Sequence, residues 1–246
     1  GVLRPPCATD TGPGILGAPP AGRRGRAAAR TVDVGYFATG PIWRGISQGT
    51  RTTMRDGMTL PSARWYRRRL VDERTASRVR RFPVRDRRKS AFLVSGTEVL
   101  FLPEEFPSLD AVTVYNGWFP GLSRPLSLYS ALADAASRLP AGRKLAGALT
   151  RPLLIGPPGG PDAALRARIP SHVVALASPD DPGSAPLAEV HLEGPNPYSL
   201  TGELIAWAAH RLATGSGATP GVVGPTAAFG LDPLRRGCAE LGLVAV

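Results

Sequence analysis

The chain has 246 residues, of which 43% are hydrophobic, and a formal net charge of +11 at pH 7. This length and composition allow one large or two small globular domains with a sizeable core, and they exclude a chain that is disordered throughout. The sequence contains no run of about 18 or more uncharged apolar residues and no short apolar segment after a basic start, so it predicts neither a membrane span nor a signal peptide. We therefore expect a cytoplasmic protein.

Most of the positive charge lies in one segment, residues 64–89, which we call the arginine-rich segment. It holds twelve basic and three acidic residues. Such a segment is typical of a solvated surface, of a site for an anionic ligand or cofactor phosphate, or of a nucleic-acid surface. Because no nucleic-acid recognition motif accompanies the charge, we expect a solvated surface and keep nucleic acid as an alternative partner.

The first thirty residues differ in composition from the rest of the chain. Residues 1–30 are rich in Gly, Pro, Ala and Arg without periodicity, which predicts an irregular or disordered segment. Residues 12–17 match the pattern G-x-G-x-x-G, but no apolar strand precedes them, and Pro19 and Pro20 prevent a helix behind them, so we expect no cofactor site there. Regular patterns begin at residue 31, and we expect one folded domain over residues 31–246.

Alternating apolar residues predict the strands of this domain. Val32, Val34 and Tyr36 lie on one side of residues 31–39, the two-residue period of a half-buried strand. Further strands are predicted at residues 77–84, 91–95, 111–118, 172–177 and 187–192. The turn-forming residues 178–184 between the last two predict an antiparallel hairpin, and residues 126–149 predict helices interrupted near Pro140.

Two helices are predicted near the end of the chain. Leu200, Leu204 and Leu212 belong to a four-residue repeat over residues 199–213, so one face of this helix must be buried. A last helix is predicted over residues 232–241, with Asp232 as its N-cap and Gly242 as its end. Strands followed by helices without strict alternation favour an α/β fold with α+β character, in which a mixed sheet has helices on one side.

Residues 44–51 form a candidate site for an anion. In this segment Ser47 can cap a helix, while Gly49 and Thr50 expose backbone amides and a hydroxyl. A helix N-terminus of this kind suits a carboxylate or a phosphate, and Arg44 and Arg51 would add positive charge. An ordinary helix cap explains the same residues.

Other chemistries have less support. Glu189, His191 and Glu193 alternate on a predicted strand and share one face, which is in principle a metal-binding row, but a solvated polar face is the simpler interpretation, and we expect no metal. Neither His172 nor His210 has a Ser or Cys neighbour in a nucleophile context. Since G-x-S-x-G, H-E-x-x-H and C-x-x-C are all absent, the sequence does not favour a hydrolase or a metalloprotease.

Two segments near the end carry a family resemblance. Residues 193–203 read EGPNPYSLTGE, and residues 224–232 read GPTAAFGLD. Together they resemble the closing signature of the saccharopine dehydrogenase-like reductases. The Ser-x-Gly-Thr turn at residues 47–50 and the loop at residues 116–124 are also similar to segments of that family. The resemblance extends over roughly residue 33 to the carboxyl terminus.

The resemblance implies a function for the chain. It would be the C-terminal, substrate-binding half of an NAD(P)-dependent oxidoreductase, with the dinucleotide-binding Rossmann half absent, and it would move a hydride to or from a small organic substrate. Arg44, Ser47, Gly49 and Thr50 would bind the substrate, and Tyr198 and Thr201 would face the cofactor. These last two residues could equally pack the helix onto the sheet. No catalytic residue is assigned.

The resemblance also bears on cofactor and partners. NADP or NAD would serve the full enzyme, whereas we expect this chain alone to bind neither and to be inactive. Related family members resemble enoyl reductases of lipid or polyketide assembly, so the substrate stays open. A separate Rossmann half and a homo-oligomer are the expected partners. Two alternatives remain, namely a basic nucleic-acid-binding or scaffolding protein, and an inactive truncated remnant.

Overall fold

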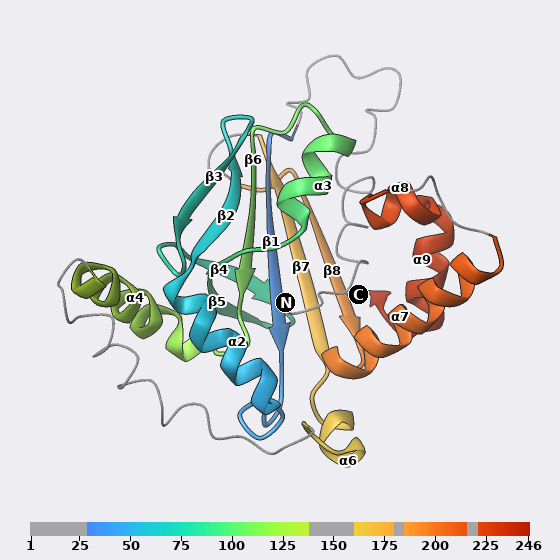
Figure 1. The fold of residues 1–246 in the computed structure, drawn as a ribbon, viewed down its shortest axis with the longest axis horizontal. Helices are drawn as coiled ribbons and strands as arrows, with labels where there is room; N and C mark the ends of the chain where they lie inside the picture. The colour runs from blue at the N-terminus through green and yellow to red at the C-terminus, as the bar shows by residue number, and fades with distance from the viewer. Residues whose placement is uncertain (1–28, 138–159, 180–184, 216–220) are drawn as a thin grey trace.

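The computed structural model describes residues 29–137, 160–179, 185–215 and 221–246 (Figure 1). The strands are β1 (Thr31–Ala38), β2 (Pro61–Tyr66), β3 (Arg69–Arg74), β4 (Val79–Val84), β5 (Arg87–Val94), β6 (Ala111–Asn116), β7 (Ser171–Ser178), β8 (Ala188–Gly194) and β9 (Val244–Ala245). The helices are α2 (Gln48–Thr59), α3 (Glu98–Glu105), η2 (Pro120–Leu122), α4 (Ser123–Ser137), α6 (Ala163–Ala167), α7 (Pro197–Ala213), α8 (Pro225–Phe229) and α9 (Leu231–Glu240).

The strands form one mixed sheet of nine strands in the order β3-β2-β6-β1-β7-β8-β9, with β4 and β5 attached beside it. In the centre, β1 runs parallel to β6 and antiparallel to β7, and the remaining described pairs are antiparallel. The outer edge of β6 is shared, because β2 pairs with its first residues and β5 with its last. The expected α/β class with a mixed sheet is therefore confirmed, as is the antiparallel hairpin of β7 and β8.

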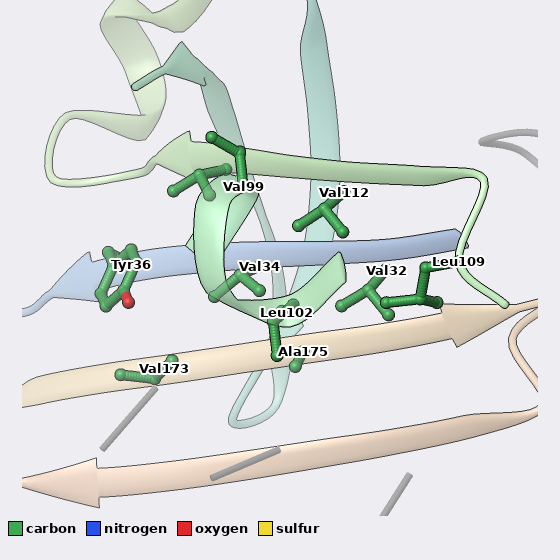
Figure 2. Close-up of a cluster of buried hydrophobic side chains, with 10 residues drawn as sticks. Val32, Val34, Tyr36, Val99, Leu102, Leu109, Val112, Val173 and Ala175 are labelled. Carbon is green, nitrogen blue, oxygen red and sulfur yellow. The ribbon is translucent and has the colours of Figure 1, made fainter. Parts of the chain in front are cut away.

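The central strand β1 is covered on both faces. On one face Val32, Val34 and Tyr36 pack against α3 in a cluster that also includes side chains of β6 and β7 (Figure 2). On the other face Phe37 makes an edge-to-face contact with Phe82 of β4, with ring centroids 5.6 Å apart. All residues of β1 are buried, so the prediction of a half-buried strand is wrong, and the β4–β5 hairpin is the reason.

The last helices lie beside β8 (Figure 1), and their apolar side chains form a further cluster. Leu200 and Leu204 of α7 pack with Leu234 and Cys238 of α9, which confirms a buried face on α7. The predicted N-cap of the last helix is wrong: α9 begins at Leu231 after Gly230, which has φ +77°, and Asp232 lies in its first turn. The end of this helix is confirmed, because Gly242 follows it with φ +84°.

Several predictions fall on residues outside the described ranges. These are the irregular segment up to residue 28 with its G-x-G-x-x-G pattern, the helical residues 138–149 and the turn at residues 180–184. No helix in the described part of the chain has the length and apolar character that a bilayer span needs.

Candidate functional site

Three hydroxyl groups meet where the loop after β1 reaches the start of α7. The hydroxyl oxygen of Tyr198 lies 2.7 Å from Thr50 Oγ1 and 3.3 Å from Ser47 Oγ, and it accepts a hydrogen bond of 3.1 Å from the Ser47 amide. Ser47 Oγ in turn accepts from the Thr50 amide at 3.2 Å, which caps α2 as predicted. We call Ser47, Thr50 and Tyr198 the hydroxyl cluster. It joins residues about 150 positions apart in the sequence.

Asn196 fixes the position of Tyr198 in this cluster. Its side-chain oxygen accepts from the Tyr198 amide at 2.9 Å and so caps α7, and Pro197 follows at the first helical position. The Nδ2 group of Asn196, which is buried, donates to the carbonyl of Ile169 at 3.2 Å. The start of α7 is therefore tied to the loop before β7, and the Tyr198 ring is held toward α2.

The hydroxyl cluster lies at the amino end of α2, where unpaired amides and the helix dipole favour a negative group. The three side chains are half-buried, so solvent reaches them. In this structure the Tyr198 hydroxyl accepts the hydrogen bond of the Ser47 amide. A ligand oxygen would replace this hydroxyl on the amide or accept its proton.

The other predicted site residues lie around the cluster in different ways. Gly49 is exposed in the first turn of α2, and a Cβ there would meet only Ser47 Oγ at 3.9 Å, so space does not require glycine. Arg44 is exposed, and within the described residues no hydrogen bond or ion pair joins it to the cluster. Thr201 is half-buried on α7, three residues after Tyr198. The structure thus brings Ser47, Thr50 and Tyr198 together and leaves Arg44 apart.

An aromatic pair adjoins the Ser-x-Gly-Thr turn. Trp43 is 48% exposed and stacks on the buried ring of Phe119, with centroids 4.3 Å apart. Arg51 of α2 donates to the Trp43 carbonyl and lies 5.8 Å from the centre of the Trp43 ring. Phe119 belongs to residues 116–124, the loop with a family resemblance, whereas no sequence pattern pointed to Trp43.

A cavity of about 340 Å³ lies on the sheet face under the β4–β5 hairpin. It is lined by Val84, Arg85, His172, Val174, His191, Leu192, Glu193 and Val246. Arg85, in the turn between β4 and β5, forms a two-pronged ion pair with Glu193 of β8. His172 of β7 is 3% exposed, and its Nε2 atom lies 3.2 Å from Thr39 Oγ1.

His172 and Glu193 in the cavity have shifted pKa values. Burial lowers the pKa of His172, although the nearby Glu193 carboxylate opposes that shift. The hydrogen bond from Arg85 lowers the pKa of Glu193. The imidazole is therefore neutral and the carboxylate charged near neutral pH.

The row of Glu189, His191 and Glu193 does share one face, as expected from its alternation. His191 Nε2 lies 3.3 Å from Glu189 Oε2, while Glu193 pairs with Arg85. Across the described ranges, no three His, Cys, Asp or Glu side chains converge in a way that could hold a metal ion.

Much of the arginine-rich segment is part of the fold. The half-buried Arg80 forms an ion pair with the buried Asp33 of β1, and the buried Arg64 lies 3.1 Å from Glu73. The exposed arginines of the segment are Arg67, Arg68, Arg69, Arg78, Arg81, Arg85, Arg87 and Arg88. The interpretation of the whole segment as a solvated surface is wrong for Arg64 and Arg80, because the β2–β3 and β4–β5 hairpins turn these two side chains inward.

Comparison with known proteins gives little further information. No family model and no curated protein sequence matches the chain. The solved structure of apo saccharopine dehydrogenase (L-Glu forming) from Saccharomyces cerevisiae is similar over 89% of this chain and 67% of that chain, with 9% sequence identity and a TM-score of 0.45. A likeness this distant assigns no substrate, cofactor or residue role to the chain.

Proposed function

We propose that this chain is the substrate-binding part of an NAD(P)-dependent oxidoreductase that works together with a dinucleotide-binding half. The observation that carries the proposal is the hydrogen bonding of Tyr198, from the segment that resembles the family's closing signature, to Ser47 and Thr50 of the Ser-x-Gly-Thr turn. Two segments about 150 positions apart in the sequence thus supply one cluster. It joins a phenolic hydroxyl, two aliphatic hydroxyls and a helix N-terminus.

The hydroxyl groups of Ser47, Thr50 and Tyr198 suit a small polar substrate and the nicotinamide ring better than a whole dinucleotide. No turn in the described residues carries the G-x-G-x-x-G pattern that holds a pyrophosphate, so the dinucleotide would be held elsewhere. Ser47 and Thr50 would hold an oxygen of the substrate at the amino end of α2. The cofactor would supply or accept the hydride.

Tyr198 is the residue that we assign to proton transfer. Reduction of a carbonyl or an imine by hydride leaves negative charge on oxygen or nitrogen, and a positioned hydroxyl can donate the proton that neutralises it. The Tyr198 oxygen would then keep the hydrogen bond that it accepts from the Ser47 amide, at 3.1 Å in this structure. Thr50 Oγ1, at 2.7 Å, can donate a hydrogen bond to the phenolate that this transfer leaves, and the phenolate regains its proton from solvent.

The proposal is tested by kinetics on the protein as its source cell makes it. Small oxo, imino and enoyl compounds are offered with NADPH or NADH, and cofactor consumption is followed by absorbance. We expect consumption with one class of compound and a loss of about 10² or more in kcat/KM for Tyr198→Phe, the size typical of general acid catalysis. A preparation that binds neither dinucleotide would overturn the proposal.

A further inference from the structure

The cavity under the β4–β5 hairpin has one apolar side and one polar side. Val84, Val174 and Val246 line it with aliphatic side chains, while Arg85, His172, His191 and Glu193 bring polar atoms. The Leu192 side chain packs on the opposite face of the sheet. A volume of about 340 Å³ lies within the range of small-molecule sites. These side chains come from β4, the β4–β5 turn, β7 and β8, and they are separate from the hydroxyl cluster.

Hydrogen-bond donors remain available at the polar side. Arg85 uses its Nε and one Nη2 hydrogen on Glu193, and a guanidinium carries five N–H groups in all. His172 Nε2 is taken by Thr39, whereas its Nδ1 atom lies 3.6 Å from Glu193 Oε2, which is too far for a hydrogen bond. Arg85 and His172 can therefore each offer a further hydrogen bond beside the Glu193 carboxylate.

The electrostatic field at the cavity favours an anion. The hairpin tip carries Arg87, Arg88 and Lys89 next to Arg85, with Asp86 as its acid. The positive charges of Arg85 and Lys89 lower the pKa of His172, and the negative charge of Glu193 raises it. The Arg85–Glu193 pair is neutral as a unit, so the tip keeps an excess of positive charge.

We propose that this cavity binds a small organic carboxylate with a short aliphatic body, and that binding takes up one proton on His172. The aliphatic body would contact Val84, Val174 and Val246, and the carboxylate would accept from Arg85 and from His172 Nδ1. A carboxylate added beside the neutral Arg85–Glu193 pair leaves one negative charge in a half-buried place. A proton on His172 restores neutrality.

The groups that face His172 determine whether carboxylate binding adds or removes a proton there. They are Glu193 and His191 on β8, Glu189 beside His191, Arg85 in the β4–β5 turn, Lys89 on β5 and Thr39 after β1. Burial and the two cations keep His172 neutral when the cavity is free, while a bound carboxylate favours its charged form. Affinity therefore rises as the pH falls.

Calorimetric titration with isovalerate tests the proposal, with isopentylamine and isopentanol as matched controls of the same carbon skeleton. We expect isovalerate alone to bind and its affinity to increase up to about tenfold per pH unit between about pH 8 and about pH 6. Titrations in buffers of different ionisation enthalpy should report the uptake of one proton. Equal binding of the amine or the alcohol, absence of isovalerate binding, or a pH-independent affinity would each overturn the proposal.

Two variants and one spectrum identify the residue. Arg85→Gln should weaken isovalerate binding, and His172→Gln should remove its pH dependence, while His210→Gln on the exposed side of α7 should change neither. If His172→Gln does not fold, imidazole NMR signals of the unaltered protein answer the same question. Isovalerate should then shift the titration of His172 to higher pH, and a His172 signal that does not respond contradicts the assignment.

Discussion

At the scale of single residues, the Tyr198 hydroxyl links the two segments of the candidate site. It accepts from the Ser47 amide and lies within hydrogen-bond distance of Ser47 Oγ and Thr50 Oγ1. These contacts connect α2 and α7, which are far apart in the sequence. The same hydroxyl therefore serves both the stability and the proposed chemistry of the site.

Replacement of Tyr198 by Phe should lower the free energy of unfolding by about 1–2 kcal/mol, because the Ser47 amide loses its acceptor. Tyr129 on α4 is a matched control, since its hydroxyl is buried and has no hydrogen-bond partner among the residues that the structure describes. Tyr129→Phe should leave the stability unchanged or raise it slightly. Urea unfolding of both variants measures the difference, and equal effects would argue against a bonded Tyr198.

The buried imidazole of His172 predicts a dependence of stability on pH. Burial lowers its pKa in the folded state, so the unfolded chain binds more protons as the pH falls below the ordinary histidine value of about 6.5. The stabilisation is complete above that pH and decreases below it. Glu193, whose pKa is lowered by its hydrogen bond from Arg85, adds a second loss near the ordinary glutamate value of about 4.3 and below.

Unfolding midpoints at about pH 8 and about pH 5.5 measure the histidine contribution. We expect the unaltered protein to lose stability between these two values, and His172→Gln to lose less. The exposed His210 is the control, and His210→Gln should behave as the unaltered protein does. A His172→Gln variant with the full pH dependence would show that another group titrates.

At the scale of elements, two glycines in neighbouring helices have opposite roles. A Cβ on Gly237 of α9 would lie 2.4 Å from the Trp207 ring of α7, whereas a Cβ on Gly202 of α7 would meet nothing within 4 Å. Gly237 thus permits the close approach of α9 to α7. Gly202 has no such packing reason.

Alanine substitution at these two glycines should change stability in opposite directions. Gly202→Ala should stabilise the protein by about 0.5–1 kcal/mol through helix propensity. Gly237→Ala should destabilise it by about 1–3 kcal/mol, because the helices must move apart. Thermal or urea unfolding measures both changes, and a stabilising Gly237→Ala would contradict the packing of α7 on α9.

The β2–β3 turn is built from unusual residues. Arg67 and Arg68 have φ values of 51° and 61°, a left-handed conformation that two-residue hairpins require and that Asn or Gly adopts more readily. Arg67→Asn should therefore stabilise the protein by several tenths of a kcal/mol, and Arg67→Val should destabilise it by about 1–2 kcal/mol. The two urea midpoints should lie on opposite sides of the midpoint of the unaltered protein.

Some elements could be predicted from sequence patterns, and others, such as the strands that this turn joins, could not. β1, β7 and β8 alternate or run apolar between clear turns, and they were found, but β2 and β3 meet at an Arg-Arg turn that lacks a turn signal. Along β2, a charged residue, Arg64, occupies a buried position and interrupts the apolar pattern. Its charge is balanced by Glu73 of β3, which the sequence pattern does not reveal. In α3, Pro103 lies inside the helix and hides the helical period.

The candidate site could be predicted only in pieces. Ser47 and Thr50 carry a helix-cap pattern, and Tyr198 lies in the segment with the family resemblance. Nothing in the sequence measures the 2.7 Å between Thr50 Oγ1 and the Tyr198 hydroxyl. The cavity was missed for the same reason, since Arg85, His172 and Glu193 stand on three separate elements that only the folded sheet brings together.

At the scale of the whole molecule, the sheet and the α7–α9 cluster place two groups of polar side chains around its central strands. The hydroxyl cluster joins the loop after β1 to the start of α7, and the cavity lies between the β4–β5 hairpin and β7 and β8. Thr39 and Ser47 both belong to the loop after β1, and they contact His172 and Tyr198 respectively. A ligand at either place can therefore affect the same loop.

The central claim is that the hydroxyl cluster faces a nicotinamide ring. Saturation-transfer NMR tests it most directly on the natively purified protein with ring-labelled tyrosine, with Tyr198→Phe identifying the signal of that residue. The account predicts that NADPH or NADH binds and that saturation passes between the nicotinamide protons and the Tyr198 ring. A bound dinucleotide without transfer to Tyr198, or no binding of either dinucleotide, would contradict it.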